Sequence, residues 1–203
     1  MVPEFGVPGF GRARRLFYGI LAVAAAAVVI FVGFLAYAAF TLPMSPVAAA
    51  DLPSSAAVYA TDSGQPLAVR GVYHGDAIRA DKLPPYLAKA VVAIEDRRFF
   101  EHHGIDPKSI MRAALNNVSG SEVEGGSTIT QQLARVRYLS PERSFRRKVQ
   151  EAMLALWLEA RLGKNEILAR YLNSVYFGAG AVGADAAARR YFGKSVYDLD
   201  LAQ

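Results

Sequence analysis

The stretch EDRRFFEHHGID, residues 95–106, follows a segment in which apolar residues recur at helical spacing. It is rich in charged, aromatic and histidine side chains and contains one glycine near its end. Three interpretations are open for this stretch. It is a solvated charge run at a helix end, a metal site, or the seat of a catalytic carboxylate. The patterns on either side of it favour some of these interpretations over others.

A helix is predicted just before this stretch. Two consecutive prolines at 84–85 favour a helix start, and apolar residues then recur at helical spacing, at Leu87, Val91 and Ile94. If the helix continues at about 100° per residue, Glu95 falls on the flank of the apolar stripe, whereas Asp96 turns away from it. We therefore expect a half-buried Glu95.

A carboxylate against apolar neighbours is desolvated, and desolvation is a recurrent way to tune a catalytic glutamate. The alternative for Glu95 is an ordinary ion pair with Arg97 or Arg98 at the helix end, because structural ion pairs also perturb carboxylates. Placement on the helix leaves both roles open.

The two histidines of the stretch argue against a metal site. On a helix, His102 and His103 diverge by about 100° and cannot share an ion, and the chain holds only one further histidine, His74. Zinc chemistry is therefore set aside, and no metal ligands are predicted. We expect one of the two histidines to cap or pack at the helix end before Gly104.

A second glutamate stands in SFRRKVQEAMLALWLEARLG, residues 144–163. We expect a helix here, capped by Ser144, continuing to about Leu162 and stopped by Gly163. Glu151 precedes its most apolar half, where a lone buried charge is costly. An ion pair with Arg147, four residues back, and a functional role are both open. Two semi-buried glutamates on different helices are also what chemistry at a sugar carbon uses.

Between these helices lies GGSTITQQLAR, residues 125–135, which has neither the Gly-Lys-Ser/Thr of a P-loop nor a dinucleotide fingerprint. Its simplest interpretation is a loop in which Ser127 or Thr128 caps a helix. A basic cluster follows, opposed only by Glu142: Arg135, Arg137, Arg143, Arg146, Arg147 and Lys148. The cluster is either a solvated face or an anion site, and guanidinium groups suit phosphate oxygens well.

The N-terminal part predicts one membrane span. Residues 16–42 form an uncharged, mostly apolar segment. This segment is longer than the roughly 20 apolar residues that suffice to cross a bilayer. A signal peptide, whose apolar region is shorter, is the alternative. Arginines at 12, 14 and 15 favour a cytoplasmic segment 1–15. On the other side of the membrane we expect a linker at 43–57 and an extracytoplasmic domain at 58–203.

Composition narrows the function classes. The 203-residue chain has no cysteine, which excludes disulfides, thiol nucleophiles and thiolate metal sites. Its net charge is +5, and this basic balance suits an anionic lipid surface or a phosphate-bearing substrate. Nucleic acid is not an expected partner on the outer side of a membrane.

The outer domain is predicted to be mainly α. A hairpin is expected at 58–69, around Asp62-Ser63-Gly64. A buried helical stripe follows the 144–163 helix, at Ile167, Leu168, Tyr171, Leu172 and Val175. Ser195 or Asp198 is placed to cap a further helix that begins close to Gln203, so we expect a final helix or a larger protein to continue beyond it.

Five motifs now combine in order: EDRRFFEHHGID, GGSTITQQLAR, RRKVQE, KNEILARYLNSVYFG and RRYFGKSVYDLDLA. In sequence and spacing they resemble the five motifs of the peptidoglycan glycosyltransferase family, glycosyltransferase family 51. Members of this family are monofunctional transglycosylases or the N-terminal domains of class A penicillin-binding proteins. The resemblance covers about residue 58 to the C-terminus.

The resemblance implies a mainly α, lysozyme-like domain with a core lobe and a smaller membrane-proximal jaw at roughly 104–135, preceded by one transmembrane helix. It implies polymerisation of lipid II into glycan strands, with release of undecaprenyl pyrophosphate and inversion at the donor carbon. No cofactor is required, and the family leaves room for a divalent cation, Mg²⁺ or Mn²⁺, between Glu151 and the pyrophosphate.

The resemblance also assigns residues. Glu95 matches the catalytic base that deprotonates the acceptor 4-hydroxyl, and Glu151 matches the second essential glutamate, at the departing pyrophosphate. The basic residues facing the pyrophosphate match Arg135, Arg143 and Lys148. Further substrate-binding positions of the cleft match Asp96, Arg112, Ser127, Thr130, Gln131 and Gln132. Phe99 and Gly104 complete the first motif, and Tyr171 and Asn173 belong to a motif that we interpret as mainly structural.

Two other functions are weighed against this one. The first is a lysozyme-like lytic enzyme, which does not need a basic cluster. The second is a truncated, membrane-tethered fragment that binds lipid II or cell-wall synthesis and division proteins without turnover. The expected partners are lipid II, the growing glycan strand and membrane lipids, at the bacterial inner membrane.

Overall fold

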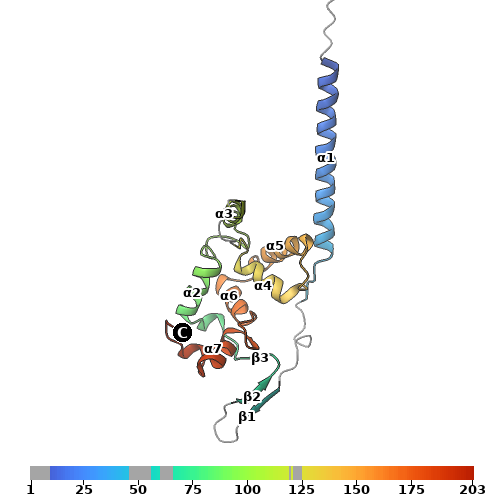
Figure 1. The fold of residues 1–203 in the computed structure, drawn as a ribbon. Coiled ribbons are helices and arrows are strands. Elements are labelled where there is room, and N and C mark those ends of the chain that lie inside the picture. The colour runs from blue at the N-terminus through green and yellow to red at the C-terminus, as the bar shows by residue number, and fades with distance from the viewer. Residues whose placement is uncertain (1–9, 46–55, 60–65, 119, 121–124) are drawn as a thin grey trace, which may run out of the picture. The chain divides into compact units, whose positions relative to one another are not determined.

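The computed structural model describes residues 10–45, 56–59, 66–118, 120 and 125–203 (Figure 1). The chain divides into two compact units, Met1–Leu42 and Pro43–Gln203. The first described element, α1, runs over Phe10–Phe40. Its segment Arg14–Phe40 is long and apolar enough to cross a membrane, a test that an N-terminal signal sequence passes as well. The single apolar helix expected near the N-terminus is thus present.

The second unit is mainly helical, which confirms the predicted fold class (Figure 1). Its α-helices are α2 (Pro85–Glu95), α3 (Pro107–Val118), α4 (Ile129–Tyr138), α5 (Phe145–Glu159), α6 (Lys164–Leu172) and α7 (Ala184–Phe192). Two short 3₁₀ helices, η2 (Ala80–Lys82) and η3 (Val196–Asp198), complete the helical elements of the described residues. Pro85 occupies the first turn of α2, as the paired prolines predict.

The strands of the second unit are short. β1 (Ala56–Tyr59) pairs antiparallel with β2 (Pro66–Arg70), so the predicted hairpin is confirmed, although its turn lies outside the described residues. β3 (Tyr73–His74) pairs parallel with β4 (Ala181–Val182), which brings the start of the domain to the region before α7.

The core of the unit lies where α4, α5 and α6 pack together (Figure 1). Most of the large, fully buried apolar side chains come from these three helices: Ile129, Leu133, Leu154, Leu158, Ile167, Leu168 and Leu172. Phe99 and Val196, outside them, are also fully buried. The predicted stripe is confirmed on α6 at Ile167, Leu168, Tyr171 and Leu172, which form the face that the core requires. Val175 lies beyond the end of α6 and is only partly buried. Removing this apolar area from water is the main driving force that holds the three helices together.

Two predicted boundaries are wrong. The long helix ends at Glu159 rather than Leu162, because the backbone N–H of Arg161 bonds to the carbonyl of Leu158 and tightens the last turn. Gly163 then begins α6 as its N-cap instead of ending α5. Within the jaw implied at roughly 104–135, α4 buries Ile129, Leu133 and Ala134 and packs with α5 and α6 in the core. The division into a core lobe and a jaw stays a prediction.

Gly104 shows why the 95–106 stretch needs a glycine. Its φ is +84°, a conformation that other residues rarely adopt. A Cβ at this position would lie 2.8 Å from the carbonyl carbon and oxygen of Ala155 on α5. The Gly104 carbonyl also accepts a hydrogen bond of 2.7 Å from Thr128 Oγ1, at the start of α4. The glycine therefore lets the chain pass directly over α5.

Asp185 holds the C-terminal end of the domain. This buried carboxylate, near the start of α7, accepts hydrogen bonds from the backbone N–H groups of Asp76 and Val196 and from Arg189 Nε, at 2.8, 3.0 and 2.7 Å. Burial raises the pKa of Asp185, but the hydrogen bonds and the charge of Arg189 lower it by more, so the pKa lies below its ordinary value. One carboxylate thus joins β3, α7 and η3.

Replacing Gly104 by alanine is expected to lower the free energy of unfolding by about 1–3 kcal/mol, because it adds backbone strain and a clash with α5. Urea unfolding of the detergent-solubilised chain measures this. Gly125→Ala is the matched control, because no atom lies within 4 Å of a Cβ there. Equal stability of the two variants would contradict the role assigned to Gly104.

Asp185→Asn is expected to cost about 1–3 kcal/mol at neutral pH, because charge-assisted hydrogen bonds are lost. Since the folded pKa lies below the unfolded value of 3.8, the ionised group stabilises the fold above that value, and this contribution is lost as the pH falls through the folded pKa. Wild type should therefore lose more stability on acidification than the variant. Unfolding measured across acid pH tests this, with the exposed Asp198→Asn as control.

Candidate active site

The end of α2 separates the two adjacent acids of the first motif. α2 ends at Glu95, and Asp96 leaves the helix with φ −160° and ψ 76°. Glu95 is exposed, whereas Asp96 is buried. The expected half-buried Glu95 and outward-facing Asp96 are therefore wrong. α2 buries none of its residues, and Ile94 beside Glu95 is 81% exposed, whereas Asp96 lies beyond the helix, where the helical projection no longer applies. Phe99 is fully buried, but it lies in the turn after α2.

Asp96 organises the residues around it. His102 Nε2 lies 2.9 and 3.0 Å from its two carboxylate oxygens, and the backbone N–H of Ile129 donates to Oδ2 at 3.1 Å. The negative charge therefore sits at the N-terminus of α4, where helix dipoles favour an anion. The expectation that one of the two histidines packs here is confirmed for His102. His103 is exposed.

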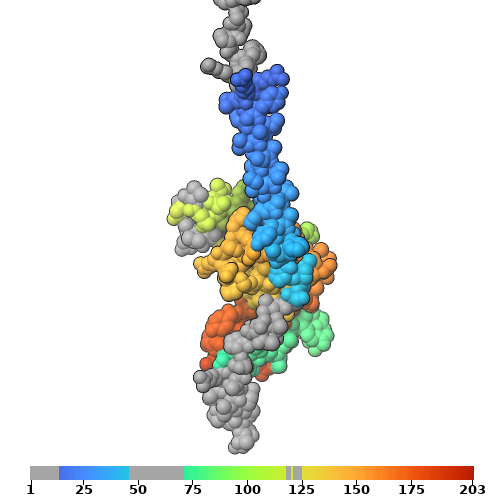
Figure 2. Space-filling model, turned by 90° about the vertical axis from the view of Figure 1, so that its right-hand side faces the viewer, coloured from blue at the N-terminus to red at the C-terminus, as the bar shows by residue number. Residues whose placement is uncertain are grey.

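A pocket opens between the end of α2, the start of α3 and the loop before α4. It is lined by Ile94, Glu95, Asp96, Arg97, Ser109, Arg112, Gly125, Gly126, Ser127 and Thr128. We call it the α2–α3 pocket. One of its boundaries, α3, projects from the side of the body formed by α4 and α5, as Figure 2 shows in space-filling form.

Glu95 is held from the core side by Gln132. The side-chain amide of Gln132, on α4, donates from Nε2 to Glu95 Oε2 at 2.8 Å. Its carbonyl oxygen accepts from the hydroxyl of Tyr171, on α6, at 3.1 Å. Burial, and then the negative charge of Glu95, raise the pKa of Tyr171 to about 12, against a smaller opposing effect of Arg135. Tyr171 is therefore a neutral hydrogen-bond donor at physiological pH.

Glu151 has a different environment from Glu95. It is only 1% exposed, and its two oxygens bond separately to Arg147 Nη1 and to Lys148 Nζ, the latter at 2.9 Å. The expected ion pair with Arg147 is thus confirmed, and Lys148 is a second partner. Two cationic partners offset the cost of burying this carboxylate, which would be high for an unpaired charge.

Lys148 links Glu151 to the α2–α3 pocket. Its Nζ also donates to Ser127 Oγ at 2.6 Å, and Ser127 lines the pocket. Three predicted site residues, Ser127, Lys148 and Glu151, therefore form a continuous chain of contacts. Together with Glu95 and Gln132, they bring two carboxylates of different environment to one region of the domain.

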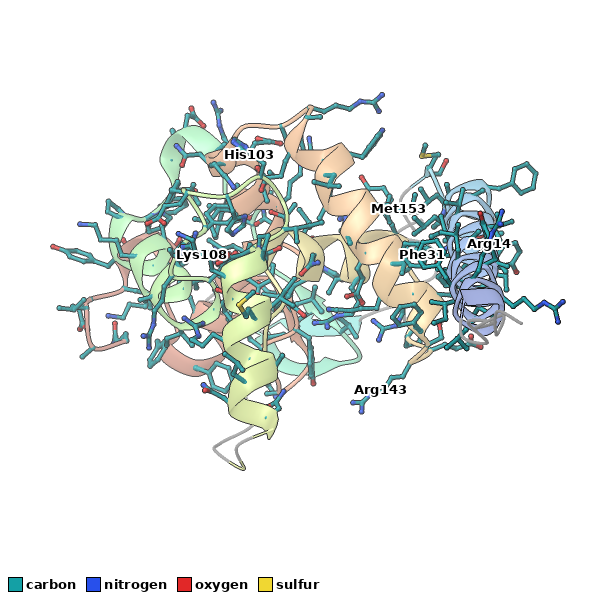
Figure 3. The ribbon with its side chains drawn as sticks, turned by 90° about the horizontal axis from the view of Figure 1, so that it is seen from above. Arg14, Phe31, His103, Lys108, Arg143 and Met153 are labelled. Atoms are coloured by element: carbon teal, nitrogen blue, oxygen red, sulfur yellow. The ribbon has the colours of Figure 1, made fainter. Side chains whose placement is uncertain are left out.

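The other predicted site residues are placed less uniformly. Arg112 lines the pocket. Thr130 is fully buried and donates to Glu159 Oε1 at 2.7 Å. Arg135 lies near Tyr171, where its charge acts on the phenol. Arg143 is exposed and projects outward from the chain just before α5 (Figure 3). Substrate contacts of these residues stay predictions.

Gln131 has a capping role that its motif alone does not reveal. Thr128 begins α4, its side chain accepts from the backbone N–H of Gln131, and Gln131 Oε1 accepts from the backbone N–H of Thr128 at 3.0 Å. This reciprocal capping box satisfies two helix-end donors. Thr128 as the cap is confirmed. The Thr-x-x-Gln spacing could have indicated the partner, and Gln131 lies outside the pocket lining.

A second, partly buried network has no signal in the sequence pattern. Lys164 Nζ donates to the carbonyl of His102 at 2.6 Å and to Glu159 Oε1 at 2.8 Å, and it lies 4.5 Å from the centre of the Phe99 ring. This network fixes the first motif against α5 and α6. Asn173 likewise exchanges two 2.8 Å hydrogen bonds with the backbone of Ile78, in keeping with the structural role expected for it.

Metal ligands are not gathered anywhere in the described part of the chain, where no group of three His, Cys, Asp or Glu side chains could hold an ion. At Glu151 both carboxylate oxygens already bond to cationic groups. A divalent cation at this carboxylate would have to compete with Arg147 and Lys148.

Comparison with known proteins agrees with this architecture. A family model described as Transglycosylase matches residues 63–203. Penicillin-binding protein 1A of Aquifex aeolicus is 40% identical over 189 residues, which are 93% of this chain and 26% of the relative. Penicillin-binding protein 1A of Escherichia coli is 48% identical over 145 residues, 71% of this chain and 17% of the relative. This chain thus spans about a quarter or less of the length of these relatives.

The match defines the class of protein. The chain belongs to the transglycosylase family, the peptidoglycan glycosyltransferases that the five motifs resemble. It is similar to the transglycosylase part of penicillin-binding proteins 1A over most of its length.

The contrast between the two adjacent acids predicts unequal effects on stability. Asp96→Asn is expected to lower the free energy of unfolding by about 1–3 kcal/mol, because it disrupts buried charge-assisted hydrogen bonds. Glu95→Gln, at an exposed position, should change it by no more than about 0.5 kcal/mol. Urea unfolding followed by circular dichroism measures both, and a larger loss for Glu95→Gln than for Asp96→Asn would overturn this placement of the two acids.

Proposed function

We propose that this domain polymerises lipid II, a disaccharide-peptide carried on undecaprenyl pyrophosphate, into glycan strands. The observation that carries the proposal is the α2–α3 pocket, with the solvent-accessible carboxylate Glu95 in its lining and Ser127 beside it, bonded to Lys148. Membership of the transglycosylase family supports the reaction class.

Glu95 is proposed as the general base. One of its oxygens, Oε2, accepts from Gln132, and the carboxylate faces a pocket open to solvent. A carboxylate held in this way can take the proton from the acceptor 4-hydroxyl as that oxygen attacks the donor sugar carbon. The new glycosidic bond forms as the bond to pyrophosphate breaks, so a single displacement inverts the configuration at that carbon.

Lys148 and Glu151 are proposed to organise the leaving-group side. The pyrophosphate gains negative charge as its bond to the sugar breaks, and preorganised cations stabilise charge that develops in the transition state. Lys148 is half exposed, whereas Glu151 is buried beneath it. Glu151 thus fixes the Lys148 ammonium group beside Ser127, and we propose that Arg135 and Arg143 add positive charge for the same leaving group.

The substrate is proposed to arrive along the membrane. The apolar helix Arg14–Phe40 can tether the domain to the inner membrane, and we propose that its basic N-terminal side faces the cytoplasm. Tethering raises the effective concentration of a lipid-linked substrate. A divalent cation, Mg²⁺ or Mn²⁺, stays a proposal of the family resemblance, and neither the proton transfer to Glu95 nor the displacement at the sugar carbon depends on it. Cell-wall synthesis and division proteins are further proposed partners.

A lytic enzyme is the second candidate, because a pair of acidic residues can also cleave glycan. Release of muropeptides from purified sacculi would favour it. A tethered fragment that binds lipid II without turnover is the third, and it predicts binding with no polymer. Neither candidate needs a cation that stabilises a departing pyrophosphate, which is the role proposed here for Lys148.

Glu95→Gln is expected to lower the rate of glycan polymerisation at least about 100-fold, because a general base is lost, while binding of lipid II is retained. Labelled lipid II is incubated with the full chain, and the products are resolved by gel. Glu101→Gln, an exposed acid in the same stretch that pairs with Arg98, is the matched control. Polymer formation by Glu95→Gln at the wild-type rate would sink the assignment.

A further inference from the structure

Tyr171 occupies an unusual position beneath the exposed Glu95. It lies on α6 and is only 5% exposed, yet its hydroxyl points to a side chain that contacts the surface carboxylate. The three groups come from three different helices: Glu95 ends α2, Gln132 lies on α4, and Tyr171 lies on α6. The core helix α6 is thereby connected to the pocket through one amide.

The chemistry of the three groups allows only one arrangement of hydrogen bonds. An ionised carboxylate only accepts, so Gln132 must turn its NH₂ toward Glu95. The amide oxygen then faces α6 and needs a donor, which the phenol of Tyr171 supplies. If the amide rotated by half a turn, its oxygen would face the carboxylate and repel it. The carboxylate therefore selects this orientation of Gln132, and the Tyr171 hydroxyl stabilises it by supplying the donor that the amide oxygen needs.

We propose that Tyr171 is a positioning residue, which acts through Gln132 to fix the orientation of the Glu95 carboxylate. The proposal rests on the proposed function for its kinetic consequences, but the positioning itself is a property of the folded chain. Tyr171 does not line the α2–α3 pocket, so it acts through Gln132 and not on substrate directly.

Positioning is needed here because Glu95 is exposed. An exposed glutamate samples several rotamers, and a base acts only when an oxygen lies within hydrogen-bond reach of the proton it removes. The bond from Gln132 engages Oε2 and leaves Oε1 for the acceptor hydroxyl. The charged groups that act on the Tyr171 phenol are Glu95 and, on α4, Arg135.

The first test is Tyr171→Phe in the full chain, which keeps the ring and removes the hydroxyl. We expect kcat for polymerisation to fall about tenfold, the loss of one oriented hydrogen bond, with KM nearly unchanged. The acidic limb of the pH–rate profile should move to higher pH, because the charged form of the base loses an oriented donor. Tyr138→Phe, a similarly buried tyrosine on α4 that packs against Trp157, is the matched control.

A double-mutant cycle separates positioning from general loss of stability. If Tyr171 acts through Gln132, Tyr171→Phe should have no further effect on kcat in a Gln132→Met background. Multiplication of the two single-variant losses in the double variant would overturn the proposal, and so would a wild-type pH–rate profile for Tyr171→Phe.

A readout without catalysis keeps the positioning role separate from the proposed function. The side-chain ¹³C carboxyl signal of Glu95, assigned by its loss in Glu95→Gln, is titrated in wild type and in Tyr171→Phe. A shift of its midpoint to higher pH in the variant supports the positioning role, whether or not the wild type forms polymer. A wild type that forms no polymer would refute only the proposed glycosyltransferase function. An identical midpoint in an active wild type refutes the positioning role and leaves the function intact.

Discussion

The buried carboxylate of Asp96 joins the parts of the outer unit on which the site depends. Its oxygens accept hydrogen bonds from the ring Nε2 of His102, six residues later in the chain, and from the backbone N–H of Ile129 at the start of α4. A charge this deeply buried is tolerated only when its lone pairs are matched, so the loop after α2 and the start of α4 must come together. That meeting ends α2 at Glu95 and leaves the Glu95 side chain at the surface. The exposed candidate base is therefore a consequence of its buried neighbour.

The same physical rule recurs at other buried acids of the domain. Glu151 is matched by Arg147 and Lys148, and Asp185 by Arg189 together with two backbone N–H groups. Asp96 and Asp185 join separate chain segments directly, whereas Glu151 bonds within α5 and reaches the loop before α4 only through the contact of Lys148 with Ser127. The apolar core of α4, α5 and α6 removes the hydrophobic side chains from water. The paired charges then fix how the chain segments are placed against one another. The α2–α3 pocket is formed where the Asp96 network lies beside Ser109 and Arg112 of α3.

The proposed division of labour between two glutamates follows from their surroundings. Glu95 keeps an oxygen open to the pocket, which suits proton transfer, whereas both oxygens of Glu151 are engaged by cations, which suits the placement of positive charge at a leaving group. Lys148 connects the second glutamate to Ser127 in the pocket lining. A polymerase of pyrophosphate-linked sugars needs both properties at once, and a hydrolase of neutral glycan needs only the first.

The sequence by itself determined the mainly α fold, the apolar N-terminal helix and the cap Ser144, because each depends on residues a few positions apart. It narrowed the cap of α4 to Ser127 or Thr128 and indicated Arg147 as the natural ion-pair partner of Glu151. The five motifs also indicated the family that the comparison then showed. Tertiary structure alone decided that Asp96 is buried, that Glu95 is exposed, and that Lys148 reaches Ser127. Gln132 and Tyr171 contact each other across 39 residues, a separation at which helical periodicity carries no information. Local pattern fixes which face of a helix is apolar, whereas the partner of a polar side chain is set by the packing of distant helices.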